Sequence, residues 1–198
     1  TTITIANNTF SGQTHNNIQF TDNIIADLDA IYLNNTFDKC AVITDGTNIK
    51  AGTEFTTILQ NAIDDCIDGD IINVAAGTYT EILNLQNKQL TINGAGSTQT
   101  IIDAIGTTAY AIQNLGDNVT ISGIKLTNGG NYGFKASGCS NLTLTDILVE
   151  DNAKTAIDIL GVQVATLTNI AVHNTAGGFG LSIGDSDNVT VENVTTSG

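Results

Sequence analysis

A repeat of 23 or 24 residues in the second half of the chain constrains the fold more than any other feature. Its copies start at Asn118, Asn141, Val164 and Asn188, and each opens with alternating apolar and polar residues. Alternation with a period of two is typical of a β-strand, and strands that recur at this interval are typical of one coil of a solenoid. The sequence therefore predicts a parallel β-solenoid in which each coil stacks on the one before it.

The columns of the repeat distinguish an inner face from an outer face, because neighbouring residues of a strand point to opposite sides. The inward columns are apolar and contain Val119, Leu142, Ala165 and Val189, then Ile121, Leu144, Leu167 and Val191. The outward column between them is a threonine ladder of Thr120, Thr143, Thr166 and Thr190, which ordinary β-propensity explains. Further inward columns predict a second strand per coil from Ile124, Ile147 and Ile170, and a third from Phe134, Ile157 and Leu181.

A polar column marks the corner between the second and third strands. Asn128, Asp151 and Asn174 recur there at intervals of 23 residues. Small polar side chains favour turns because they form hydrogen bonds with nearby backbone groups. We therefore expect a stacked turn ladder along this corner.

Upstream of the repeat, residues 55–67 carry apolar side chains at helical spacing and predict a single amphipathic helix. The segments Gly77-Thr-Tyr-x-Glu81 and Ile92-x-Gly-x-Gly96 follow it. With these landmarks, residues 55–103 resemble the start of the right-handed parallel β-helix proteins of the pectin-lyase-like superfamily, and with the coils the resemblance extends over residues 40–198. It implies an all-β fold, a single-stranded right-handed parallel β-helix with one N-terminal capping α-helix. No specific enzyme family is matched.

The two ends of the chain resemble each other. Residues 3–12 align without a gap with residues 189–198, and Asn7-Asn-Thr-Phe10 recurs as Asn34-Asn-Thr-Phe37. We expect residues 1–39 to form partial coils or an inter-subunit segment, and residues 40–198 to form the β-helix. Because the repeat runs to the last residues with no capping segment, we expect end-to-end self-association or contact with neighbouring solenoid segments.

The charge balance excludes one class of partner. Twenty acidic residues face six lysines, and the chain contains no arginine, so its formal net charge is -14. Nucleic-acid binding depends on clustered Lys and Arg, so no nucleic-acid partner is expected. The sequence contains no run of 18 apolar residues, so no transmembrane segment is expected. The composition, low in lysine and rich in Thr, Asn, Gly and Asp, favours an extracellular or cell-surface location.

The three cysteines leave two interpretations open. A disulfide between Cys40 and Cys66 would tie the capping helix to the segment before it, with a stabilisation of about 3 kcal/mol from loop entropy. Alternatively, Cys66 packs as a small apolar residue on its helix face. Cys139 aligns with Val162 of the next coil, so we expect it to be buried.

No complete catalytic motif is present. The lyase-like and esterase-like enzymes of the superfamily use an arginine, and the polygalacturonase-like ones need a His-Gly pair that neither His15 nor His173 provides. The weak catalytic candidates are Lys135, Glu150 and His173. Lys135 aligns with Asp158, which favours an ion pair over a general base, and Glu150 aligns with His173, which favours a cross-coil hydrogen bond.

Cofactors are not expected from the sequence, with one weak exception. The turn containing Asp185 and Asp187 gathers oxygen ligands of the kind that Ca²⁺ prefers, but it lacks the spacing of a calcium-binding loop. An ordinary solvated turn is the favoured interpretation of this segment.

Two function classes remain. The favoured prediction is a non-catalytic extracellular structural or adhesive β-helix, as a head-to-tail filament subunit or a segment of a larger surface protein. The alternative is a polysaccharide-active β-helix enzyme or a carbohydrate-binding module. An enzyme requires a groove lined by acids and lysines, whereas a structural solenoid requires only ladders and covered ends.

Overall fold

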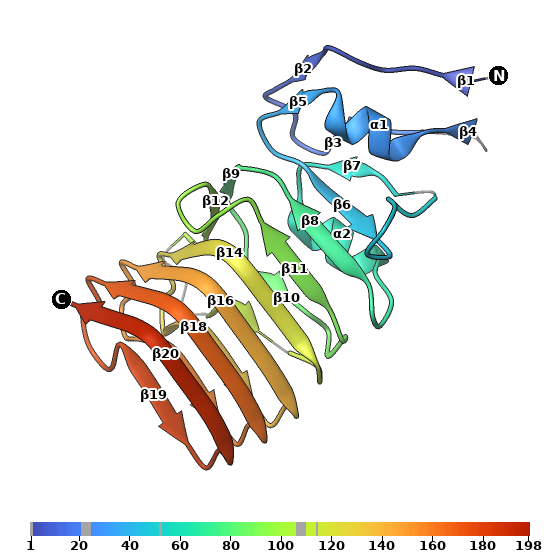
Figure 1. Cartoon of the computed structure of the whole chain (residues 1–198). Helices are drawn as coiled ribbons and strands as arrows, with labels where there is room; N and C mark the ends of the chain where they lie inside the picture. The colour runs from blue at the N-terminus through green and yellow to red at the C-terminus, as the bar shows by residue number, and fades with distance from the viewer. Residues whose placement is uncertain (1, 21–24, 52, 106–109, 114) are drawn as a thin grey trace.

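The coils of the predicted solenoid are present in the computed structural model, which describes residues 2–20, 25–51, 53–105, 110–113 and 115–198. One sheet stacks the long strands β14 (Val119–Thr127), β16 (Asn141–Glu150), β18 (Val164–His173) and β20 (Asn188–Ser197) in parallel. A five-stranded sheet contains β10 (Leu83–Asn84), β13 (Tyr110–Gln113), β15 (Tyr132–Ser137), β17 (Thr155–Leu160) and β19 (Leu181–Gly184). Figure 1 shows the coils stacked toward the C-terminus, which confirms the parallel β-helix.

The predicted register of the long strands is correct. Leu142 pairs with Val119 and with Ala165, and Leu144 pairs with Ile121 and with Leu167. All six side chains are buried in one continuous apolar cluster. The core therefore runs along the solenoid axis, and each coil contributes equivalent side chains to it.

The first two strands of each coil are continuous, whereas the sequence predicted two separate strands. Each long strand bends at a residue with a left-handed backbone: Gly123 (φ 64°), Asp146 (φ 53°), Asn169 (φ 56°) or Asn193 (φ 52°). Gly, Asn and Asp tolerate this conformation better than other residues. One such residue therefore turns the chain without ending the strand.

The N-terminal coils of the β-helix use shorter strands. β8 (Ile71–Val74) and β11 (Thr91–Gly94) continue one half of the long sheet, while β9 (Gly77–Tyr79) and β12 (Thr100–Asp103) continue the other half. Beyond β8 the pairing becomes antiparallel through β6 (Ala41–Thr44), β7 (Phe55–Thr56) and β3 (Asn16–Ile18). This change of direction ends the regular parallel stack.

The capping helix α2 (Leu59–Asp65) is shorter than the predicted 55–67, because Phe55 and Thr56 pair as strand β7. Leu59, Ala62 and Ile63 of α2 are buried against the end of the core. The carboxylate of Glu81 accepts hydrogen bonds from the backbone N–H groups of Leu59 and Gln60 at 2.9 and 2.8 Å. Glu81 thereby satisfies two of the N–H groups that a helix leaves unpaired at its start.

The glycines of Ile92-x-Gly-x-Gly96 allow two coils to approach closely. A Cβ atom on Gly94 would lie 2.1 Å from the carbonyl oxygen of Gly123, in the following coil. The N–H of Gly96 donates a 3.0 Å hydrogen bond to the same oxygen. This landmark is therefore a packing requirement of the coil.

The N-terminal segment contains a second short helix, which the sequence did not predict. Helix α1 (Leu28–Leu33) begins where Asp27 accepts a 2.9 Å hydrogen bond from the N–H of Ala30. Around it, β1 (Thr2–Ile3) pairs in parallel with β4 (Ile25–Ala26), and β2 (Thr9–Phe10) with β5 (Thr36–Phe37). The recurring Asn-Asn-Thr-Phe segments thus lie side by side, with the rings of Phe10 and Phe37 stacked at 5.1 Å.

Candidate functional site

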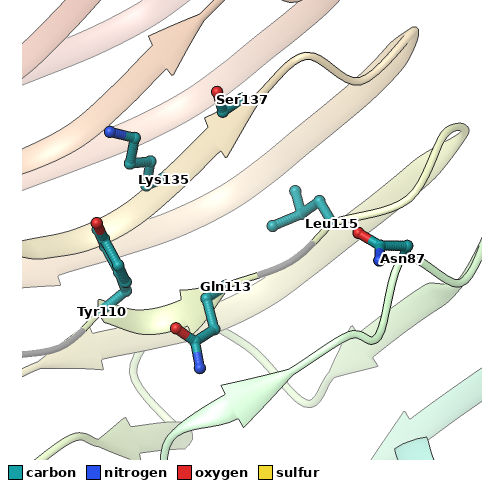
Figure 2. A pocket seen from close by; sticks show the side chains of 6 residues that line it. All are labelled: Asn87, Tyr110, Gln113, Leu115, Lys135 and Ser137. Carbon is teal, nitrogen blue, oxygen red and sulfur yellow. The ribbon is translucent and has the colours of Figure 1, made fainter.

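A hollow of about 220 Å³ lies on the outer side of the five-stranded sheet. Six residues line it: Asn87, Tyr110, Gln113, Leu115, Lys135 and Ser137. Figure 2 shows that Tyr110 and Gln113 come from β13, and Lys135 and Ser137 from the neighbouring β15. On β15 the buried Phe134 and Ala136 alternate with Lys135 and Ser137, so the strand pleat directs the two polar residues outward. We call this site the tyrosine–lysine hollow.

Tyr110 and Lys135 line the tyrosine–lysine hollow, and Tyr132 stacks on Tyr110 next to it. Tyr110 pairs in register with Tyr132, and their ring centroids lie 5.3 Å apart with an interplanar angle of 21°. The Nζ atom of Lys135 lies 4.9 Å from the Tyr132 centroid and 5.9 Å from the Tyr110 centroid. These distances are typical of cation–π contacts.

Lys135 also forms the cross-coil ion pair expected from the alignment with Asp158. The two residues pair in register between β15 and β17, and Nζ lies 3.5 Å from Oδ2 of Asp158. Both side chains are largely shielded from solvent. The ammonium group of Lys135 is therefore held in place by a carboxylate and two aromatic rings.

The lining of the hollow combines several hydrogen-bonding groups with one aliphatic side chain. It offers the amides of Asn87 and Gln113, the hydroxyl of Ser137 and the apolar side chain of Leu115. None of the six lining residues is a carboxylate or an imidazole, the groups that most often act as general acids and bases. The arrangement combines an apolar patch with several converging hydrogen-bonding groups, as small-molecule sites do.

The structure does not bring Glu150 and His173 together as a bonded pair, although they pair in register. Glu150 forms an ion pair with Lys125 of the preceding coil. Nδ1 of His173 lies 2.7 Å from the hydroxyl oxygen of Ser197 in the following coil. The expected hydrogen bond between Glu150 and His173 was wrong, because each side chain has a partner in the opposite direction along the stack.

The turn ladder is a structural feature. Asn128, Asp151 and Asn174 all have left-handed backbones, with φ of 59°, 55° and 52°. The Nδ2 atom of Asn128 donates to Oδ1 of Asp103 at 2.9 Å, and Nδ2 of Asn174 to Oδ1 of Asp151 at 3.4 Å. Asp103 of the preceding coil therefore bonds to the first residue of the ladder, although its register partner is Thr127. The sequence did not predict this contact, because Asp103 lies one residue outside the column.

The threonine ladder lies on the outer face of the long sheet. Thr120, Thr143, Thr166 and Thr190 pair in register, and Thr91 of β11 extends the ladder by one coil. No charged group belongs to this column, so it offers hydroxyl and methyl groups only. We assign it no chemical role.

All three cysteines are free and buried. Cys40 and Cys66 belong to different apolar clusters, so the disulfide considered from the sequence is not formed in this structure. Burial raises the pKa of both thiols to about 12. Since the thiolate is the reactive form of cysteine, neither residue is suited to nucleophilic catalysis.

Asp185 and Asp187 lie in the exposed turn between β19 and β20. Asp185 has a left-handed backbone with φ of 47°, and the N–H of Asp187 donates to the carbonyl of Val162. Within the part of the chain that the structure describes, no three His, Cys, Asp or Glu side chains gather as a metal site. Ca²⁺ binding at this turn stays a prediction from the sequence.

Sequence reasoning missed the stacked tyrosine pair, of which Tyr110 lines the hollow. Tyr110 and Tyr132 are 22 residues apart, close to the repeat period, but the coil containing Tyr110 precedes the clear repeats. An alignment extended by one coil toward the N-terminus would have placed the two rings in one column. Asn87 and Leu115 lie outside the strands of the five-stranded sheet, and no periodicity indicates their positions.

Comparison with known proteins supports the fold and leaves the activity open. Residues 110–198 match the family model described as "Right handed beta helix region". No curated protein and no solved structure matches the chain. In the described segments, no helix has the length and apolar character needed to cross a membrane.

Proposed function

Because this chain is a right-handed parallel β-helix, we propose that it is a non-catalytic extracellular module of adhesive type that binds a glycan in the tyrosine–lysine hollow. One observation carries the proposal. The hollow places one ring of a stacked tyrosine pair and an apolar side chain next to two amides, a hydroxyl and an ammonium group, without an acid or imidazole in its lining.

A sugar ring matches this set of groups. Its C–H face is apolar and can lie against the Tyr110 ring and Leu115, while its hydroxyls can donate to and accept from the amides of Asn87 and Gln113. Pockets for drug-sized ligands measure about 300–1,000 Å³, and this one is smaller, at about 220 Å³. It therefore suits one ring of a longer chain that lies along the outer surface.

The charge of the protein favours a neutral glycan. With a formal net charge of -14, the molecule repels polyanions at a distance. Lys135 is the one cation in the lining, and Asp158 offsets its charge at 3.5 Å. We therefore propose a neutral polysaccharide as the ligand.

A polysaccharide-active enzyme is the second candidate, and it is disfavoured by the same residues. Without arginine, the chain cannot complete the lyase-like or esterase-like patterns that the resemblance to the pectin-lyase-like superfamily implies. Lys135 is the only titratable lining residue other than Tyr110, and it is engaged by Asp158 and the two rings. The proposed role is therefore recognition.

The test is affinity electrophoresis and calorimetry of the wild type on a panel of neutral and acidic polysaccharides. We expect retention by at least one neutral polysaccharide, and a loss of about tenfold or more in affinity for Tyr110→Ala and for Gln113→Leu, since about 1.4 kcal/mol corresponds to tenfold. Thr143→Ala, on the outer face of the long sheet, is the matched control and should bind as the wild type does. Circular dichroism establishes that each variant is folded.

Three outcomes would overturn the proposal: no retention on any polysaccharide, unchanged affinity in both variants of the hollow, or release of shortened oligosaccharides during incubation. The last outcome would instead favour the enzyme.

A further inference from the structure

The coil formed by β19 and β20 leaves its inward side chains accessible. Val191 is 40% exposed, whereas Leu167, the equivalent residue of the preceding coil, is 0% exposed. Ile183 is 44% exposed, and its partner Ile159 is 0% exposed. Among the described strands, β20 pairs with β18 only, so one of its edges carries unpaired backbone groups. Such an edge readily accepts another strand.

The N-terminal layer shares with β20 a left-handed bend between two extended stretches, although its strands β1 and β2 are only two residues long. Residues 3–12 align with residues 189–198, and the alignment places Asn7 at the position of Asn193. Both asparagines have left-handed backbones, with φ of 61° and 52°. β1 and β2 flank Asn7 in the way that the two halves of β20 flank Asn193. Residues 2–10 therefore contain a short strand, a left-handed bend and a second short strand, in the same order as in a coil of the β-helix.

The free edges of these two layers are complementary in direction. In a parallel β-helix, each strand pairs with the preceding coil on one edge and with the following coil on the other. β1 and β2 pair with later residues, through β4 and β5, so their free edge is the one that a preceding coil would occupy. β20 pairs with the earlier β18, so its free edge is the one that a following coil would occupy.

The apolar sides of the two layers also correspond. The alignment places Ile3 opposite Val189 and Ile5 opposite Val191. A hollow of about 250 Å³ lies beside Ile3 and Ile5, between this layer and α1, so apolar volume is available there. Figure 1 shows residues 2–12 as the outermost layer at the end of the molecule opposite the C-terminus. A contact between the layers can therefore form without moving other elements.

From these observations we infer that residues 3–12 of one copy dock on β20 of a second copy and extend the β-helix head to tail. Asn7 then continues the asparagine column in which Nδ2 of Asn193 donates to Oδ1 of Asn169 at 3.1 Å. Because the contact joins two different surfaces by a translation along the solenoid axis, it does not close into a ring and produces a filament. The net charge of -14 opposes this contact, so screening by salt should promote it.

The test uses two complementary variants of the full chain. Val191→Asp blocks the β20 surface and leaves the N-terminal layer intact, while Ile5→Asp does the reverse. Each variant alone should remain monomeric in analytical ultracentrifugation at concentrations where the wild type forms fibres in negative-stain micrographs. An equimolar mixture should form heterodimers and stop there, because each variant retains one functional surface. Thr143→Asp, on the outer threonine ladder, is the control and should assemble as the wild type does.

A deletion of residues 1–12 provides a second way to remove the N-terminal layer if Ile5→Asp does not fold, and it should likewise pair with Val191→Asp only. A wild-type protein that remains monomeric at every protein and salt concentration would overturn the inference. The surface of β20 would then be covered by another segment, such as further coils of a longer chain. Fibres that persist in both single variants would also overturn it, since they would use another surface.

Discussion

The hydroxyl group of Tyr79 offers a quantitative test of how the coils are joined to the antiparallel end of the sheet. Tyr79 is fully buried, and its hydroxyl accepts a 2.9 Å hydrogen bond from the N–H of Cys40. The same oxygen lies 3.1 Å from the carbonyl oxygens of Cys40 and Ala75. Both carbonyls have a second donor, because Cys40 O accepts from Ala75 N–H at 2.8 Å and Ala75 O from the Thr100 hydroxyl at 3.2 Å.

Replacing Tyr79 by Phe therefore leaves one group without a partner, the buried N–H of Cys40. An unsatisfied buried donor costs about 1–3 kcal/mol, and the ring itself is retained, so no large cavity is added. For a chain of this size, each kcal/mol lowers Tm by about 2–4 °C, which gives an expected decrease of roughly 2–12 °C.

The assay is thermal and urea unfolding of the wild type, Tyr79→Phe and the matched variant Tyr32→Phe. Tyr32 is partly buried against the N-terminal apolar cluster, and its hydroxyl has no hydrogen bond to any described residue. Tyr32→Phe should therefore shift Tm by less than Tyr79→Phe does. Equal shifts in the two variants would refute the assignment of the cost to the Cys40 N–H.

Two further predictions concern the landmarks of the first coils. Burial raises the pKa of Glu81 above its usual 4.5, so the folded state binds the proton of Glu81 more tightly than the unfolded state does. The stabilisation from this group is complete below the unfolded pKa of 4.5, and it is lost as the pH rises through the raised pKa of the folded state. Relative to Glu81→Gln, the wild type should thus gain stability as pH falls from neutral toward 4.5, which urea unfolding at a series of pH values measures. Gly94→Ala should cost about 1–3 kcal/mol or more by overpacking against the Gly123 carbonyl, 2.1 Å from the new Cβ. Gly138→Ala, which meets no atom within 4 Å, should cost only the strain of its positive φ, and the two denaturation midpoints give the comparison.

The register of the coils could be predicted because every coil repeats the same constraint. Inner columns such as Leu142 and Leu144 must be apolar in each turn, so four copies of the pattern fix the stacking. The partners of charged side chains could not be predicted in the same way. Glu150 has one possible neighbour in the preceding coil and another in the following coil, and only the three-dimensional arrangement shows that it pairs with Lys125.

The tyrosine–lysine hollow was only half predictable, because a concave surface depends on differences between coils. Lys135 and Asp158 are equivalent positions of the repeat, and their ion pair follows from the alignment. The open space beside Lys135 depends instead on Asn87 and Leu115, which belong to the connections of a shorter coil. Regular columns predict contacts along the stack, whereas departures from regularity create the hollow.

The left-handed bend in each long strand was signalled by a change of phase in the alternation. Inward residues occur at Ile121 and then at Ile124, three positions later instead of two, so a strictly alternating strand would place Ile124 on the outside. Both residues can face inward if one of the two residues between them bends the chain, and Gly123 does so with φ of 64°. The same reasoning applies to Asn7, whose φ of 61° bends a segment of matching sequence at the far end of the molecule. The N-terminal layer and β20 therefore share a left-handed bend, and their free edges face in opposite directions along the stack. These are the features that allow the N-terminal layer of one copy to continue the sheet from β20 of another.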